Sequence, residues 1–306
     1  MAKKYGVPYQ GSKSGIAAKV IGVLPEAKHL YDLFAGGCAI SHAAILSGKW
    51  ERIHANDISD APRLFVDAVN GRYEDERRWI SREDFFALKG TDPYVRGCWS
   101  FGNNGLSYMY SQKIEPYKKA CHYAIVFDDW GLLAELCPEV VDACKGALAG
   151  LVETKQRRLA FGPAVVRWLK ANGTAEMVDS NPLYNSCHKK KDRSLERLES
   201  LERLESLQVT QLDYREVEFE DDCVIYCDIP YNAPHGKSNR NYGVDFDYTA
   251  FYNWCCEQKH PLFISEYSMP EDRFVCVAEF PKLSTICATA AFKVTERIYR
   301  PRHQMR

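Results

Sequence analysis

The sequence predicts an α/β fold, an open sheet with helices on both faces, and two stretches carry this prediction. Residues 29–57 read as strand, glycine turn, helix and second strand, the pattern of a βαβ unit. Residues 223–227, Cys-Val-Ile-Tyr-Cys, form a short apolar run typical of a buried central strand. Because ligands bind beyond the carboxyl ends of strands in such sheets, polar residues that follow each strand are candidate site residues.

Length and composition restrict the class of protein. The chain has 306 residues, enough for one large domain or for a catalytic domain with an insert. Its apolar content of 46% and charged content of 26% are ordinary for a globular protein. No apolar run is long enough to span a bilayer, and the N-terminus lacks the apolar core of a signal peptide. We therefore expect a cytoplasmic protein without a membrane partner.

Cysteine spacing and net charge restrict the ligands. The 12 cysteines are scattered without a CxxC pair, so we expect reduced thiols and no metal site. The net charge of −1 provides no general attraction for nucleic acid. Any DNA-binding surface must therefore come from local clusters of basic residues.

The tetrapeptide Asp228-Ile229-Pro230-Tyr231 directly follows the central strand. Pro230 ends the strand, because proline donates no ladder hydrogen bond. Asp228 and the Ile229 carbonyl can accept both hydrogens of an exocyclic amine, while Tyr231 can stack on the ring that carries this amine. A base that is flipped out of a duplex needs such contacts. The alternative, of about equal weight for the tetrapeptide alone, is a capping aspartate with a core tyrosine.

Two glycine-containing turns lie in the first part of the chain. A loop with Lys13 between two glycines precedes an expected helix at 16–24 and can bring an ammonium group to a negative charge, although its spacing is not that of a P-loop. Gly36 and Gly37 separate an expected strand from a helix, and Asp57 follows the next strand about 20 residues later, where such units hold a ribose. The GxGxxG pattern is missing, which favours an adenosine-bearing cofactor other than a dinucleotide. The alternative is a βαβ unit without a ligand.

The middle of the chain is mostly helical in its pattern. We expect helices within 62–90 and from about 113 to 180, the latter interrupted at Pro138 and Pro163. Aromatic runs on both sides of residues 102–105 predict a hairpin or a tight loop. Its polar residues, and a lysine cluster further on, either contact DNA or serve only the turn and the solvated surface. The DNA-contact candidates are Arg96, Asn103, Asn104, Lys189, Lys190 and Lys191.

A repeat with leucine at every third residue covers 194–207, which fits neither the 3.5 nor the 3.6 period. We expect a short helix or an irregular linker there, without a catalytic role. Strands are expected at 209–212, 262–265, 274–280 and 292–299, the last two antiparallel, with a helix at 251–257. The polar stretch 232–247 is expected to form a loop over the site, where Lys237 and Arg240 are further DNA-contact candidates.

Five short motifs, in this order, resemble those of the Dam-like DNA adenine-N6 methyltransferases of the phage and prophage type. They are Tyr9-Gln-Gly-Ser-Lys13, Asp32-Leu-Phe-Ala-Gly-Gly37, Asn56-Asp57-Ile58, Asp213-Tyr214 and Asp228-Ile229-Pro230-Tyr231. The last one departs from the Asp-Pro-Pro-Tyr pattern of that family, since Ile229 replaces the first proline. Every residue has a carbonyl, so the acceptor survives, but isoleucine does not fix its own φ as proline does.

The resemblance implies a Rossmann-like S-adenosylmethionine-dependent methyltransferase sheet with a mostly helical inserted target-recognition domain. It implies S-adenosylmethionine as cofactor, S-adenosylhomocysteine as product, and a flipped adenine in double-stranded DNA as substrate. A monomer in the cytoplasm of a bacterial or phage-infected cell is the expected setting, without a metal. The implied catalytic parts are 1–92 and 207–306, with the recognition region at 93–206.

Residue roles follow from the same motifs. The catalytic residues would be Asp228, Ile229, Pro230 and Tyr231. The cofactor would be bound by Tyr9, Lys13, Phe34, Gly36, Gly37, Asp57, Asp213 and Tyr214.

Three alternatives remain at the level of sequence. A cytosine-N4 methyltransferase would use a similar amine-holding site, but its motif usually starts with serine. A methyltransferase of protein glutamine is disfavoured because its motif begins with asparagine. A DNA-binding module without turnover would need neither the glycine turn nor Asp57 and Asp228, so the presence of all of them together favours an enzyme.

Overall fold

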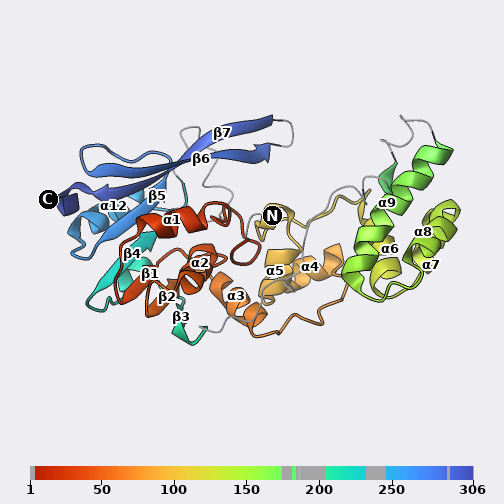
Figure 1. Ribbon diagram of the computed structural model, residues 1–306, viewed down its shortest axis with the longest axis horizontal. Helices are drawn as coiled ribbons and strands as arrows, with labels where there is room; N and C mark the ends of the chain where they lie inside the picture. The colour runs from red at the N-terminus through yellow and green to blue at the C-terminus, as the bar shows by residue number, and fades with distance from the viewer. Residues whose placement is uncertain are drawn as a thin grey trace.

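The computed structural model describes residues 4–173, 181–183, 186, 204–231, 246–287 and 290–305, except for the side chains of 282–294. A seven-stranded sheet with its helices forms one body, and the helices α6 to α9 form a second group at the other end of the molecule (Figure 1). The short helices α4 and α5 lie between them.

The sheet has the order β3-β2-β1-β4-β5-β7-β6. Its first five strands run parallel, and β7 is antiparallel to both β5 and β6. This arrangement confirms the predicted α/β class and the antiparallel pair at the C-terminal end. The strands are β1 His29–Asp32, β2 Arg52–Asn56, β3 Leu207–Thr210, β4 Cys223–Cys227, β5 Leu262–Glu266, β6 Phe274–Cys287 and β7 Ala290–Pro301.

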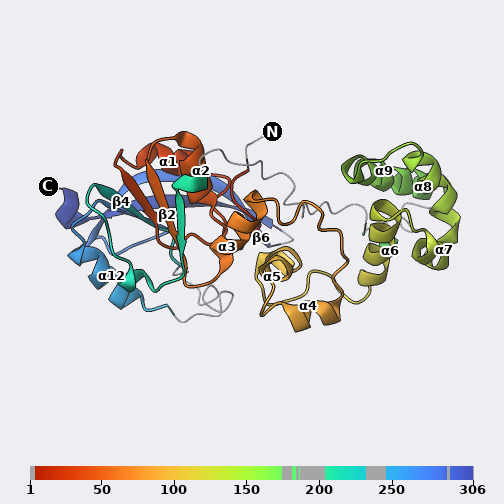
Figure 2. The same ribbon diagram turned by 90° about the horizontal axis from the view of Figure 1, so that it is seen from below.

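Helices cover both faces of the sheet, as the sequence predicts. In β4, Val224 and Tyr226 enter one hydrophobic cluster, whereas Cys223, Ile225 and Cys227 enter another, because successive side chains of a strand point to opposite faces. The first cluster contains α1 (Ala17–Val23) and α2 (Ala39–Ser47), and the second contains α12 (Tyr248–Glu257). Figure 2 shows α1 and α12 on opposite sides of the strands.

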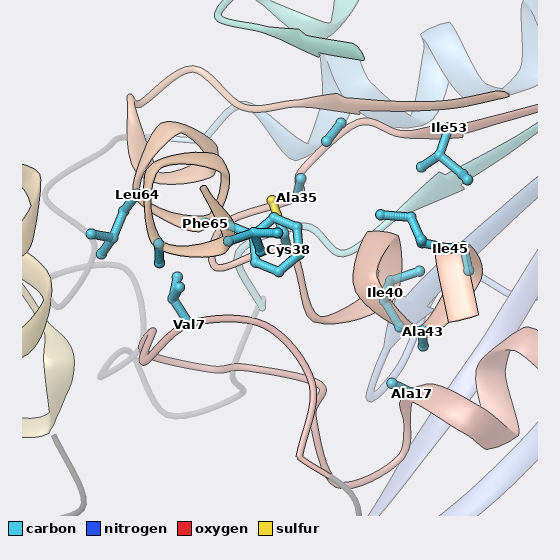
Figure 3. Close-up of a cluster of buried hydrophobic side chains, with 14 of the residues drawn as sticks. Val7, Ala17, Ala35, Cys38, Ile40, Ala43, Ile45, Ile53, Leu64 and Phe65 are labelled. Carbon is cyan, nitrogen blue, oxygen red and sulfur yellow. The ribbon is translucent and has the colours of Figure 1, made fainter. Parts of the chain in front are cut away.

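The N-terminal segment is anchored on the same core as the glycine turn. Val7 is buried and its amide donates to the Gly37 carbonyl at 2.8 Å. Figure 3 shows Val7 close to Leu64 and Phe65 of α3 (Ala61–Val69) and to Cys38, which precedes α2. The loop that carries Lys13 is therefore held at the carboxyl edge of the sheet.

One predicted strand is displaced by two residues. Residues 209–212 were expected to be extended, but β3 ends at Thr210. The side chain of Asn56 replaces the missing ladder bonds, since it donates to the Leu212 carbonyl and accepts from the Leu212 amide, both at 3.0 Å. This side-chain clamp joins the ends of β2 and β3 next to Asp57.

The segment around α4 (Arg82–Leu88), α5 (Pro93–Cys98) and η1 (Phe101–Asn103) packs on the sheet body. Its buried residues Tyr94, Cys98 and Tyr108 belong to the same hydrophobic cluster as the first strands. The expected hairpin is a tight loop closed by an antiparallel bridge between Ser100 and Tyr108. The residues just after position 92 thus share the core of the first part, and a functional boundary there stays a prediction.

The second group of helices has a core of its own, with buried residues from Ala120 to Leu183. Up to Gly173 the expected helical character and the break at Pro138 are confirmed, but the expected break at Pro163 is wrong, because α9 runs through it; the expected helix at 174–180 lies outside the described residues. Pro163 leaves the carbonyl of Leu159 without an amide partner. Both residues are exposed, so water can bind this carbonyl. The helices are α6 Glu115–Val126, α7 Gly131–Leu136, α8 Val141–Leu148 and α9 Thr154–Asn172.

Four further 3-10 turns complete the described chain: η2 Pro138–Val140, η3 Leu204–Ser206, η4 Tyr214–Glu216 and η6 Arg302–Met305. Most of the leucine repeat, residues 194–203, lies outside the described residues. No helix in the described ranges is long and apolar enough to cross a membrane. The same ranges contain no cluster of three or more His, Cys, Asp or Glu side chains suited to hold a metal ion.

Candidate active site

A pocket opens at the carboxyl ends of β1, β2 and β4, the edge where the sequence places its candidate residues. Four segments that lie far apart in the sequence line it: the loop with Lys13, the glycine turn after β1, the end of β2 with Asp57, and the tetrapeptide after β4. The lining residues are Tyr9, Gln10, Gly11, Ser12, Lys13, Asp32, Phe34, Ala35, Gly36, Gly37, Ala39, Ile40, Asp57, Ile58, Ser59, Asp228, Ile229, Pro230, Tyr231 and Phe246.

Lys13 is the centre of a buried charged cluster in this pocket. Its side chain is 3% exposed, and its ammonium group binds Asp228 Oδ1. Glu296 Oε1, from β7, lies 3.5 Å from the same ammonium, and the ring centroid of Tyr231 lies 4.5 Å away. The loop, the central strand and the antiparallel pair of strands therefore meet at one lysine.

The charges of this cluster stabilise one another. Burial alone lowers the pKa of Lys13, but the carboxylates of Asp228 and Glu296 outweigh this effect and raise the pKa above its ordinary value. Lys13 therefore stays protonated at neutral pH. Burial raises the pKa of Glu296 to about 7, and Lys13 opposes the rise while Asp228 adds to it. Glu296 therefore changes its charge near neutral pH, whereas Lys13 does not.

Each residue of the tetrapeptide is restrained by a different part of the fold. Asp228 binds Lys13, and Ile229 is 2% exposed in the hydrophobic cluster under α12. The Pro230 carbonyl accepts a hydrogen bond from the Tyr248 hydroxyl at 2.8 Å. The Tyr231 ring packs against Tyr267, with centroids 4.4 Å apart and planes at 59°. The pocket thus presents a fixed carboxylate beside a fixed aromatic ring.

The glycine turn allows a close approach of the backbone. Gly36 has φ +48°, and a Cβ on it would lie 2.5 Å from the Tyr9 ring. A Cβ on Gly37 would lie 2.7 Å from both Tyr9 Cβ and the Val7 carbonyl oxygen. Side chains are therefore excluded at both positions, and Tyr9 covers the turn at the wall of the pocket.

Asp57 holds this turn from the end of β2. It is 8% exposed; one carboxylate oxygen accepts from the Gly36 amide at 2.8 Å, and the other accepts from the Ser59 amide and hydroxyl at 2.9 and 2.7 Å. Burial raises the pKa of Asp57, and these hydrogen bonds oppose the rise. An ionised carboxylate has about four acceptor positions, so room for a ligand hydroxyl remains.

Asp32, at the end of β1, is a pocket residue that sequence reasoning did not single out. It is 1% exposed and accepts hydrogen bonds from the Ser41 amide and hydroxyl at 3.1 and 2.6 Å. Burial raises the pKa of Asp32 to about 7 against these hydrogen bonds. Its position as the last residue of a strand, at the start of the glycine motif, is a signal that would have found it. Ile58 and Phe246 also line the pocket and were missed.

An aromatic wall continues the pocket from Phe34. Its ring lies 5.5 Å from Tyr214 and 5.8 Å from Phe246, between centroids. Tyr214 is thus behind Phe34 and does not itself line the pocket within the described part of the chain. Asp213 caps η4 and pairs with Arg215 at 2.8 Å. A direct contact of Asp213 or Tyr214 with a cofactor stays a prediction.

The three described candidates for DNA contact have local partners. Arg96 pairs with Asp60, Asn103 donates to the Gly97 carbonyl at 2.9 Å, and Asn104 accepts from the backbone amides of residues 106 and 107. The bonds of Asn103 and Asn104 are those of a tight turn, whereas the Arg96–Asp60 pair joins α5 to the N-cap of α3. Contact with DNA stays a prediction. Lys189, Lys190, Lys191, Lys237 and Arg240 lie outside the described residues.

The seven-stranded sheet with its helices is compatible with a methyltransferase fold. Residues 9–70 match the family model of the D12 class N6 adenine-specific DNA methyltransferases. This match spans the Lys13 loop, the glycine turn and Asp57, and it confirms the resemblance to Dam-like enzymes over that segment. Among curated proteins, no match was found.

Proposed function

We propose that this protein transfers a methyl group from S-adenosylmethionine to N6 of an adenine that is flipped out of double-stranded DNA. The observation that carries the proposal is that two groups of residues line the same pocket. The glycine turn with Asp57 lies in the segment that matches the D12 class, and the Asp228 tetrapeptide with Lys13 lies beside it.

The pocket residues fit this cofactor. Gly36 and Gly37 both line the pocket and carry no side chain, so the methionine part can lie beside their backbone, while Tyr9 and Val7 fill the space on the Cβ side of the turn. Asp57 can accept a ribose hydroxyl, and the apolar Ile58, 61% exposed at the pocket, can cover an adenine ring. When bound, the cofactor supplies an electrophilic methyl group on a positively charged sulfur. The acidic lining with Asp32 favours such a cation.

Asp228 and Ile229 act on the acceptor amine. The Asp228 carboxylate and the Ile229 carbonyl each accept a hydrogen bond from the N6 amino group. These bonds orient the lone pair of N6 and increase the electron density on this nitrogen. The nitrogen carries one excess hydrogen after methylation, and Asp228 is placed to accept that proton. Lys13 holds Asp228 in place, and Tyr231 lines the same pocket, where its ring can contact the flipped base.

The exposed face of α9 supports DNA as the partner. Residues 154–172 contain five cations and no acidic residue, in a chain of net charge −1. Arg157 points inward and donates to backbone carbonyls of α6, whereas Lys155, Arg158, Arg167 and Lys170 are exposed. Within the described residues none of these four forms an ion pair. They extend over about 22 Å of helix, long enough to face several phosphates.

Mass spectrometry of methylated DNA tests the proposal. Purified protein is incubated with unmethylated DNA and S-adenosylmethionine, the DNA is digested to nucleosides, and the modified base is identified. N6-methyladenine, absent with Asp228→Ala, is expected. N4-methylcytosine in its place would contradict the assigned acceptor. A folded protein that binds the cofactor but methylates no base on DNAs of varied sequence would contradict DNA as substrate.

A further inference from the structure

Part of the tetrapeptide backbone is not fixed by proline, and a hydrogen bond from α12 restrains this part. Each residue contributes two soft dihedrals, φ and ψ. Ile229 and Pro230 together have four such dihedrals, and Pro230 restricts two of them. The proline ring fixes φ of Pro230, and the proline Cδ restricts ψ of Ile229. The two that remain soft are φ of Ile229 and ψ of Pro230. A proline at position 229 would have fixed the first of them.

Tertiary contacts restrain both of these soft dihedrals. The Ile229 side chain is 2% exposed and packs in the cluster of β4, β5 and α12, so a rotation about φ would move it out of this core. The Pro230 carbonyl, whose direction reports ψ, accepts the Tyr248 hydroxyl at 2.8 Å. The two ends of the segment are held as well, at Asp228 by Lys13 and at Tyr231 by Tyr267.

Tyr248 is itself well placed to hold this carbonyl. It is the first residue of α12, whose N-cap Asp247 accepts the Ala250 amide at 2.9 Å. The Tyr248 ring packs on Phe246, with centroids 5.0 Å apart, and Phe246 lines the pocket. Its hydroxyl is therefore fixed by the helix start on one side and by the aromatic wall on the other.

We propose that Tyr248 is a positioning residue that, together with the buried Ile229, replaces the rigidity of the missing proline and so directs the Ile229 carbonyl at the acceptor amine. With both ends held, the middle of the segment moves only if φ of Ile229 and ψ of Pro230 rotate together. Restraint of either dihedral then suppresses the motion. The hydrogen bond from Tyr248 and a proline at position 229 would therefore each be enough to keep the segment rigid. The link to catalysis rests on the proposed function, whereas the restraint itself does not.

Hydrogen exchange tests the restraint without reference to activity. Tyr248→Phe keeps the ring and removes the hydroxyl. Amide exchange of Ile229 and Tyr231 is expected to become about tenfold faster in this variant, because the segment opens more often. Tyr252→Phe, which removes a hydroxyl one turn further along α12, is the matched control and is expected to leave this exchange unchanged. Equal exchange in wild type and Tyr248→Phe would overturn the proposal.

Kinetics and a double mutant test the link to methyl transfer. Tyr248→Phe is expected to lower kcat about tenfold while KM for DNA and the cofactor Kd stay within about twofold. In an Ile229→Pro background, the same substitution is expected to lower kcat by only about twofold. An equal loss in both backgrounds, or a loss confined to KM, would overturn the positioning role.

Two further outcomes separate this proposal from the proposed function. If wild-type protein binds the cofactor but methylates no DNA, the proposed function fails, and the exchange experiment still decides on the restraint. If Ile229→Pro does not fold, as shown by a missing thermal transition, Ile229→Val takes its place. It loosens the buried anchor and is expected to make the effect of Tyr248→Phe larger; an unchanged effect would overturn the proposal.

Discussion

The sheet body and the helical group α6–α9 distribute their charges in opposite ways. In the described chain, every buried charged side chain lies in the sheet body: Lys13, Asp32, Asp57, Glu266 and Glu296. The core of the helical group is built from apolar and cysteine side chains. Four of the five basic residues of α9, Lys155, Arg158, Arg167 and Lys170, are exposed on its surface.

Buried charges and exposed charges serve different functions. Buried charge is costly unless it is paired, so a protein retains it where chemistry needs a fixed field. Exposed cations contribute little to stability, but they attract a polyanion over a long surface. We therefore propose that the pocket performs the chemistry and that α9 provides much of the affinity for DNA, and the predictions below test this proposal.

The largest expected effect is the loss of methyl transfer in Asp228→Ala. The substitution removes the carboxylate that holds the acceptor amine, and we expect kcat to fall by at least about 1000-fold. Cofactor affinity, measured by titration calorimetry, should change by less than about threefold, because Asp57 and the glycine turn remain. Asp221→Ala, an exposed aspartate before β4, is the control. Loss of cofactor binding in a folded Asp228→Ala protein would contradict the assignment.

An intermediate effect is expected when the charge of the α9 face is reversed. The triple variant Lys155→Glu, Arg167→Glu and Lys170→Glu should bind duplex DNA at least about tenfold more weakly. The slope of log Kd against log salt concentration should fall by about 2 to 3, since three phosphate contacts are lost. The double variant Lys19→Glu and Lys259→Glu, at exposed lysines of the sheet body, is the control. Equal salt slopes in the wild type and the triple variant would show that α9 does not face the DNA.

The smallest expected effect concerns the pH dependence of stability at Glu296. Its pKa in the folded protein is raised to about 7 by burial. A raised carboxyl pKa means that the folded state favours the protonated form, so its contribution to stability is complete below the unfolded pKa and is lost as pH rises through about 7.

Chemical denaturation of Glu296→Gln between pH 5 and 8 measures this contribution. Glutamine stays neutral, so the free energy of unfolding of the variant relative to wild type should rise with pH over this range. Glu279→Gln, at a more exposed glutamate on β6, is the control. A pH-independent difference between Glu296→Gln and the wild type would show that Glu296 does not titrate in this range.

The parts of the site that were predicted share a local signal. Asp57 and Asp228 each follow an apolar strand, and Gly36 and Gly37 form a turn whose tight packing excludes any side chain. Glu296 and Tyr248 were missed because nothing in their own surroundings marks them. Glu296 lies within an ordinary-looking strand, and Tyr248 opens a short helix. Each becomes part of the site only through a partner distant in the sequence.

The predicted sheet and the predicted helix breaks also show what local sequence patterns can and cannot determine. Short apolar runs and the residues that end them were enough to predict a sheet with helices on both faces, since these patterns depend on neighbours along the chain. The pattern alone placed a helix break at Pro163, but exposure of that side of α9 allows the helix to continue. Whether proline interrupts a helix depends on what surrounds the freed carbonyl, which is a property of the fold.

Local chemistry along the chain was sufficient to determine the α/β class, the glycine turn and the carboxylates at the strand ends, because each depends on a few consecutive residues. The charged cluster of Lys13, Asp228 and Glu296 and the hydrogen bond from Tyr248 to Pro230 were decided by tertiary structure alone. Lys13 and Asp228 are 215 positions apart in the sequence. Only the packing of the sheet brings such residues within reach of one another, and the fixed geometry of the pocket depends on that packing.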